Sequence, residues 1–189
     1  MKTNILIDAK TEKICTLYKE MLDAEEYAVT MMTDAGSIRF LGLESYSAVI
    51  ISLPLSDETG VKLIGELNEK YQIPIAAVVK ADISETILGK LVEENAYILR
   101  KPVSRSSLAL AADLLSSFSR NSANLRARIA ELERKNNEVK LMSRAKLLLI
   151  GEKGMTEDQA HKYILRQSMN KQISIDRVCR EIIDNSGQR

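Results

Sequence analysis

The chain has 189 residues, of which 45% are hydrophobic and 28% charged, and this ordinary globular mixture permits one or two domains without disulfide staples. It contains two cysteines (Cys15 and Cys179) and one histidine (His161), which disfavours a disulfide scaffold, a zinc ribbon and a histidine-based catalytic triad. The net charge of +1 conceals a split: residues 1–119 hold 12 basic and 17 acidic side chains, whereas residues 120–189 hold 15 and 9. We therefore expect two parts with different partners, and the basic part is the candidate for binding a polyanion.

The amino-terminal residues include no long apolar segment followed by a cleavage site. No apolar stretch approaches the roughly 18 residues that a membrane span needs. The sparse, widely separated cysteines fit a reducing compartment. We expect a soluble, cytoplasmic protein with no membrane partner.

Short apolar runs alternate with helix-like stripes over the first 100 residues. Five runs are apolar throughout, which is typical of strands buried on both faces, at 4–7, 27–32, 47–51, 73–79 and 97–99. Between them, apolar residues at helical spacing predict helices over about 14–21, 37–43, 57–71 and 87–92. This order predicts an α/β fold with a doubly wound, parallel, five-stranded sheet, whose functional site lies at the carboxyl ends of the strands.

Two segments at these strand ends resemble a known family. Residues 98–102 (Ile-Leu-Arg-Lys-Pro) and residues 52–60, which begin with Ser52 and end with Gly60, resemble the receiver domains of response regulators. The resemblance covers residues 1–118. It implies a pocket with a phosphoacceptor Asp on the third strand, a Thr or Ser on the fourth, a Lys on the fifth, and an acidic pair that binds Mg²⁺ after the first.

In this chain the pocket positions are occupied by Asp8, Ser52, Val79 and Lys101, and of these the lysine matches clearly. A serine hydroxyl cannot form an acyl phosphate, and a single carboxylate holds Mg²⁺ poorly. We therefore expect a degenerate receiver that is not phosphorylated and has no metal or cofactor. Lys101 is interpreted as a solvated or ion-paired side chain at a turn, and Asp57 as the N-cap of the next helix.

If this domain is inert, control has to come from elsewhere. The candidates are a regulatory protein or ligand at the receiver domain, constitutive dimerisation, or the protein's own expression. The sequence does not choose among them.

Residues 110–142 carry a heptad pattern typical of a coiled coil. No Gly or Pro interrupts residues 103–150, so one long connecting helix is expected. A polar Asn at an a position commonly fixes a parallel dimer and its register. We predict a homodimer whose seam contains Leu115, Phe118, Leu125, Ile129, Leu132, Asn136 and Val139. The alternative is a single amphipathic helix packed on its own domain.

Residues 143–189 predict a bundle of three short helices. The first covers 143–150, and Gly151 and Gly154 mark its end. The second opens at a capping box, Thr156-Glu157-Asp158-Gln159, and continues to Met169. The third runs from Ser174 to near Asp184. The predicted apolar core positions are Ala145, Leu148, Leu149, Ala160, Ile164, Met169, Ile175, Val178 and Ile182.

This part is similar to the ANTAR domain of transcription antitermination regulators, over residues 130–185. The matching positions are Arg144-Ala145-Lys146, Leu149, Gly154-Met155-Thr156-Glu157, Ala160, Leu165-Arg166, Met169, Ile175, Val178 and Ile182. The chain departs from the family pattern at Leu147, Ser168 and Cys179. The resemblance implies binding to paired stem-loops in nascent leader RNA, which prevents a terminator hairpin from forming.

The charge of this part agrees with an RNA partner, because clustered cations attract phosphates and arginine also contacts splayed loop bases. Lys162 and Arg166 are four residues apart and share a helix face. The predicted RNA-binding residues are Arg144, Lys146, Lys153, Lys162, Arg166, Lys171 and Arg177, with Arg180 adding charge. For any one of them, a merely solvated helix face is the alternative. Tyr163 either stacks on a base or packs in the core, and His161 is interpreted as a surface or interface residue.

Two other functions stay open. A degenerate receiver could serve as a protein-interaction module whose basic tail is incidental, and three small helices could belong to a DNA-binding response regulator. An enzyme is not expected, because the sequence offers no Cys/His, Ser/His or paired-carboxylate constellation.

Overall fold

The structure, a computed structural model, describes residues 2–55 and 60–186. It divides into two compact units, the N-terminal unit (Met1–Asn124) and the C-terminal unit (Leu125–Arg189). Among the described residues, no helix combines the length and the apolar composition that crossing a bilayer requires.

The N-terminal unit is built on one parallel sheet with the strand order β2-β1-β3-β4-β5. This is the doubly wound order in which the chain changes direction between β1 and β3. The strands are β1 (Thr3–Ala9), β2 (Tyr27–Met32), β3 (Ala48–Ser52), β4 (Ile75–Val79) and β5 (Tyr97–Arg100). All residues of β3 and β4 are buried, as their continuous apolar runs indicate. The predicted fold class is confirmed.

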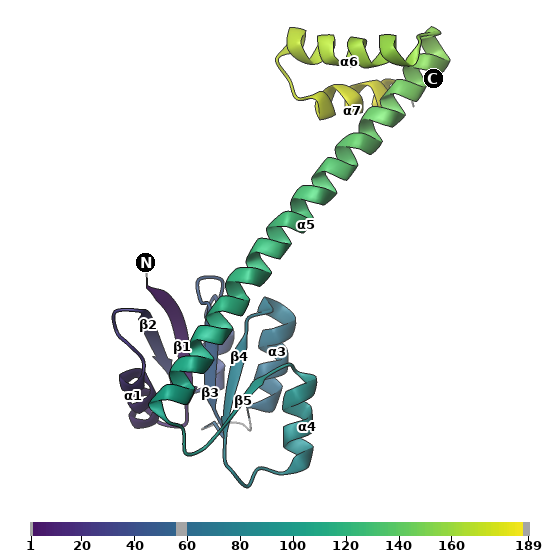
Figure 1. Cartoon of the computed structure of the whole chain (residues 1–189). Helices are drawn as coiled ribbons and strands as arrows, with labels where there is room; N and C mark the ends of the chain where they lie inside the picture. The colour runs from purple at the N-terminus through teal and green to yellow at the C-terminus, as the bar shows by residue number, and fades with distance from the viewer. Residues whose placement is uncertain (1, 56–59, 187–189) are drawn as a thin grey trace. The chain divides into compact units, whose positions relative to one another are not determined.

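Helices cover both faces of this sheet (Figure 1). They are α1 (Glu12–Met21), α2 (Ala35–Phe40), α3 (Val61–Tyr71), α4 (Glu85–Glu93) and the first turns of α5 (Arg105–Lys153). On one face, α1 and α5 bury Cys15, Tyr18 and Leu108 against the strands. On the other face, α2, α3 and α4 bury Ile38, Leu63 and Leu91.

Gly60 begins α3 in a backbone conformation that disfavours other residues. Its φ is +81°, in the left-handed region, and a Cβ built there would lie 2.3 Å from Leu53 Cδ2. Glycine at position 60, which the receiver resemblance leads us to expect, is therefore required for steric reasons. Asp57, interpreted as an N-cap, lies outside the described residues.

Helix α5 runs without interruption for 49 residues, from the N-terminal unit into the C-terminal unit. Its first turns bury Leu108, Ala111 and Ala112 in the sheet core. Leu115, predicted as a seam residue of the coiled coil, is 8% exposed and belongs to the same core. The prediction is wrong for this residue because the turn that carries it packs against the sheet.

The C-terminal unit contains the end of α5, α6 (Glu157–Lys171) and α7 (Ile175–Ser186). The predicted capping box is present: the Thr156 hydroxyl accepts from the Gln159 N–H, and the Gln159 side chain accepts from the Thr156 N–H. Gly151 does not end the preceding helix, because one glycine inside a helix costs only about 1 kcal/mol. The helix ends at Gly154, whose φ is +65°.

The three helices enclose a small core of Ala145, Leu149, Ala160, Ile164, Val178 and Cys179. Four predicted core residues lie outside it: Leu148 and Ile182 are half-buried, Met169 is 75% exposed and Ile175 is 37% exposed. Met169 and Ile175 stand near the ends of their helices, where the apolar stripe no longer faces the neighbouring helices. The departures from the family pattern also fit: Leu147 is exposed, Cys179 is buried, and Ser168 Oγ donates to the Ile173 carbonyl at 2.6 Å.

Candidate functional site

The carboxyl ends of the strands bring the four predicted receiver-pocket residues to one edge of the sheet. The register pairs Asp8 with Ile51 and Ser52 with Val78, and the Lys101 N–H donates to the Val79 carbonyl at 2.8 Å. The Lys101 ammonium donates to the Leu53 carbonyl at 3.2 Å.

The chemistry of this edge differs from that of a phosphoacceptor site. Ser52 is 2% exposed and Val79 is fully buried. In the described part of the chain, the Ser52 hydroxyl has no hydrogen-bond partner. Burial, and then the nearby Lys80 charge, lower the pKa of Lys101. Across residues 2–55 and 60–186, no three His, Cys, Asp or Glu side chains gather as a metal site.

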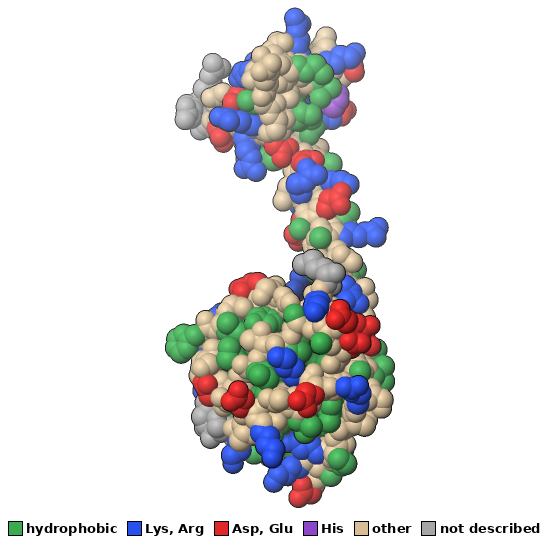
Figure 2. Space-filling view, turned by 90° about the vertical axis from the view of Figure 1, so that its left-hand side faces the viewer, with side chains coloured by type: hydrophobic (Ala, Val, Ile, Leu, Met, Phe, Trp, Pro, Cys, Tyr) green, Lys and Arg blue, Asp and Glu red, His purple; other side chains and the backbone are tan. Residues whose placement is uncertain are grey.

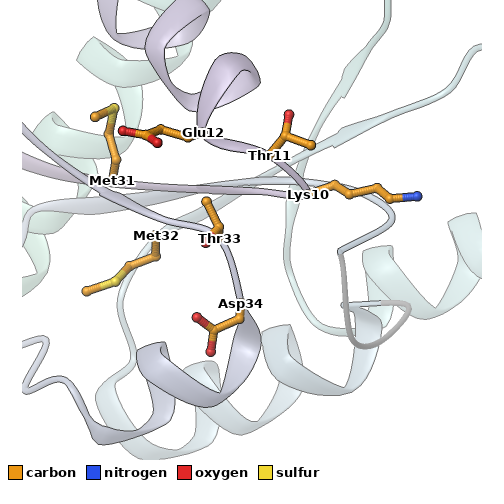
Figure 3. Close-up of a pocket in the computed structure, with 7 residues that line it drawn as sticks. All are labelled: Lys10, Thr11, Glu12, Met31, Met32, Thr33 and Asp34. Atoms are coloured by element: carbon orange, nitrogen blue, oxygen red, sulfur yellow. The ribbon is translucent and has the colours of Figure 1, made fainter.

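A hollow of about 420 Å³ lies beside this edge, at the ends of β1 and β2 (Figure 3). Thr11, Glu12, Thr33 and Asp34 line it, and the Lys10 side chain extends away from them. The Asp34 carboxylate caps α2 by accepting from the Ser37 N–H at 2.6 Å, which lowers the pKa of Asp34. The hollow itself is not predictable from the sequence, although the Asp34–Ser37 spacing is typical of a helix N-cap.

The middle of α5 exposes the remaining seam residues predicted for the coiled coil. Their exposed fractions run from 55% to 64% at Phe118, Leu125, Ile129, Leu132 and Val139. Asn136 is exposed as well. A helix packed along its own domain buries such a stripe, and α5 does not bury it.

The predicted RNA-binding residues occupy all three helices of the C-terminal unit. Arg144, Lys146 and Lys153 lie on α5, Lys162, Arg166 and Lys171 on α6, and Arg177 and Arg180 on α7. All of them are exposed except Lys146, whose side chain is 20% exposed. The structure therefore brings the predicted cations into one small unit.

These cations differ in how far acidic neighbours neutralise them. Lys146 binds Glu157 at 2.5 Å and lowers the pKa of that carboxyl. Lys162 and Lys171 bind Asp158 and Glu181, at 2.6 and 2.7 Å, and Arg177 lies 3.9 Å from Glu181. Of the arginines among these predicted cations, Arg144, Arg166 and Arg180 form no ion pair within the described ranges. These three are the most available to phosphates.

Two cavities open between the helices of this unit. One, of about 660 Å³, is lined by Val139, Met142, Lys146, His161 and Ile175, and Figure 2 shows the histidine (purple) beside exposed apolar side chains (green). The other, of about 250 Å³, includes Tyr163 in its lining. The Lys153 ammonium lies 4.9 Å from the centroid of the Tyr163 ring. Tyr163 thus both packs on the core and faces a cavity.

Comparisons with known proteins match both units. The family model described as "ANTAR domain" matches residues 130–183. Two curated relatives are similar along most of the chain, each called "Transcriptional regulatory protein PdtaR", from Mycobacterium tuberculosis strains CDC 1551 / Oshkosh and ATCC 25618 / H37Rv. Each is 30% identical over 173 residues, which cover 89% of this chain and 83% of the relative.

Solved structures match the fold of the N-terminal unit. A signal receiver domain of a putative Luxo repressor protein from Vibrio parahaemolyticus has a TM-score of 0.59 at 17% identity, covering 66% of this chain and 98% of its own. A CheY-like receiver domain protein from Methanospirillum hungatei JF-1 has a TM-score of 0.59 at 18% identity, covering 65% and 99%. At these identities the likeness shows the fold alone.

Proposed function

This chain belongs to the family of ANTAR-domain transcription antitermination regulators that carry a receiver domain, and we propose that it binds paired stem-loops in nascent leader RNA and so prevents a terminator from forming. The observation that carries the proposal is the charge of the C-terminal unit. Three of its exposed arginines, Arg144, Arg166 and Arg180, form no ion pair within the described residues. Their guanidinium groups are free to contact phosphates and loop bases.

We propose further that the protein acts as a homodimer. The exposed stripe from Phe118 to Val139 offers a second copy an apolar surface at heptad spacing. A parallel dimer carries two C-terminal units, so two linked stem-loops can be bound at once. Binding the second then becomes an intramolecular event, which raises the affinity without any new contact.

The proposed activity does not depend on phosphorylation of the receiver pocket. Ser52 offers a hydroxyl where an acyl phosphate requires a carboxylate, and Val79 offers no hydroxyl at all. Regulation then belongs to a protein or ligand partner of the N-terminal unit, to constitutive dimerisation or to the abundance of the protein. The hollow beside Asp34 is one candidate place for a ligand.

A second candidate role, that of a protein-interaction module, is favoured by exposed apolar side chains on the N-terminal unit. Val92 on α4 and Leu110 on α5 are 60% and 56% exposed. Tyr97 on β5 is 39% exposed. These residues can contact a regulatory protein, and that role is compatible with RNA binding by the other unit.

The test is a gel-shift titration of the full chain against a leader RNA with two stem-loops, with duplex DNA as the comparison nucleic acid. We expect binding that prefers RNA, falls steeply with salt and is unchanged by acetyl phosphate. Equal binding to RNA and DNA contradicts the antitermination proposal. Stronger RNA binding after treatment with acetyl phosphate contradicts the expectation that the receiver pocket is not phosphorylated.

A double variant tests which surface of the C-terminal unit binds RNA. Arg144→Ala with Arg166→Ala removes two uncommitted charges, and we expect about tenfold weaker RNA binding at moderate salt and a shallower salt dependence. The charge-matched control, Lys13→Ala with Lys90→Ala, removes two exposed charges from α1 and α4. Equal losses in both double variants indicate a general charge effect and contradict the proposed surface.

A further inference from the structure

The smaller cavity of the C-terminal unit has apolar, aromatic and amide side chains in its lining, which a surface that only attracts RNA phosphates does not need. Its volume is about 250 Å³, and its lining includes the buried side chains of Leu149 and Val178. Tyr163 and Gln167 are four residues apart on α6, so they lie on the same helix face. The cavity therefore combines an apolar floor with an aromatic ring and an amide.

Its polar lining includes three side chains that can accept hydrogen bonds and that form no ion pair. Glu152 from α5, Gln167 from α6 and Asn185 from α7 all line the cavity. Within residues 2–55 and 60–186 none of the three side chains has an ion pair or a hydrogen bond. Glu181, the other acidic lining residue, is held by Lys171 at 2.7 Å.

Two lysines stand at the same cavity. Lys153 lies over the Tyr163 ring, and Lys171 is bound to Glu181. A flat group that enters against the ring displaces the Lys153 ammonium, which then becomes available to a neighbouring phosphate. Aromatic stacking together with edge hydrogen bonds is how proteins read unpaired bases of RNA loops.

We propose that this cavity receives one unpaired base of an RNA loop and that it selects bases with an exocyclic amino group, adenine, guanine or cytosine, over uracil. The proposal rests on the RNA-binding function proposed above and adds a base-reading site to it. The Glu152 carboxylate accepts hydrogen bonds and cannot donate them. An amino group satisfies it, whereas the carbonyl oxygen of uracil at the same place leaves two acceptors facing each other.

The first experiment compares hairpins that share one stem and carry loops of only adenosine, only cytidine or only uridine. We expect the full chain to bind the uridine loop about tenfold more weakly than the other two. Glu152→Ala, which removes the acceptor, reduces this preference. Glu152→Gln, which adds a donor, restores binding to the uridine loop. A substitution that merely disturbs the fold weakens all three loops alike.

The matched control is Asn170→Ala, which removes an exposed amide from α6 outside the cavity lining and leaves the loop preference unchanged. A second arm measures saturation-transfer NMR signals of free AMP, CMP and UMP with the full chain. We expect signals from AMP and CMP that exceed those of UMP, and we expect Glu152→Ala to remove this excess.

The outcomes separate this inference from the proposed function. Hairpin binding without loop preference, or a preference that survives both Glu152→Ala and Glu152→Gln, overturns the base site and leaves RNA binding intact. If the hairpins do not bind at all, the proposed function fails and the mononucleotide signals decide the site. Equal or absent AMP and UMP signals then overturn the site.

Discussion

The carboxyl edge of the sheet and the surface of the C-terminal helices differ in what they retain of their families. The edge keeps the strand order, Gly60 and Lys101, but Ser52 and Val79 stand where phosphoryl chemistry needs a carboxylate and a hydroxyl. The C-terminal unit keeps its apolar core, its capping box and exposed arginines that form no ion pair within the described residues. An α/β core is specified by buried apolar strands, so a few pocket residues can change without loss of the fold. Under the proposed function, a charged surface tolerates fewer changes, because its attraction for phosphates depends on the charges themselves.

Among the substitutions that test this comparison, we expect those in the predicted coiled-coil seam of α5 to change RNA affinity most. Leu125→Asp with Leu132→Asp places like charges at two seam positions, so we expect a monomer by sedimentation and a loss of about a hundredfold in affinity for paired stem-loops, through lost avidity. Ala127→Asp adds a charge to the outer side of the same helix and serves as the control. A double variant that stays dimeric contradicts the seam.

Gly60→Ala tests whether the sheet edge still depends on its backbone geometry. The positive φ and the contact with Leu53 predict a loss of about 2 kcal/mol in the free energy of unfolding of the N-terminal unit. Urea denaturation followed by circular dichroism measures this loss. We expect RNA affinity to be nearly unchanged, and an equally large loss of affinity argues that the two units are coupled.

The smallest effect is expected at Lys101. Its pKa is lowered in the folded state by burial and by Lys80, so the charged form opposes folding wherever it is protonated. Below the lowered pKa the cost is fully present, and it disappears as the pH rises toward the ordinary value of 10.5. Lys101→Met is therefore expected to stabilise the unit at neutral pH, by less than about 1 kcal/mol after allowance for solvent screening.

Urea denaturation at neutral pH and near pH 10 measures this difference. If the stabilisation by Lys101→Met increases as the pH rises, this explanation is contradicted. The lost hydrogen bond to the Leu53 carbonyl works against the gain, and Lys80→Met, which relieves the repulsion and keeps that bond, isolates the charge effect.

The elements that were predictable from sequence are those with strong local signals. Continuous apolar runs such as Ala48–Ser52 mark buried parallel strands, and the capping box at Thr156 marks the start of α6. Leu115 was assigned wrongly because heptad spacing does not tell whether an apolar stripe meets a second copy or the sheet of its own domain. Gly151 was assigned wrongly because a glycine ends a helix only where a left-handed φ is adopted, as at Gly154.

The candidate sites were predictable to different degrees. The pocket residues and the cations follow from motif spacing, but their ion pairs do not, because Lys171 meets Glu181 only through the packing of α6 against α7. The small cavity was invisible for a similar reason. Periodicity reports apolar positions, whereas Glu152, Gln167 and Asn185 belong to three different helices and gather only in the folded unit.

Dimerisation through the exposed stripe on α5, as proposed above, makes the regulator's response depend on its own abundance. Its a positions include Ser122 and Asn136, so the seam is a modest zipper. Below the dissociation constant of such a dimer, the number of dimers rises with the square of the monomer concentration. If the proposed dimer is the form that binds RNA, doubling synthesis of the chain quadruples that form, and read-through of the transcript then depends steeply on protein concentration without any chemical modification of the protein.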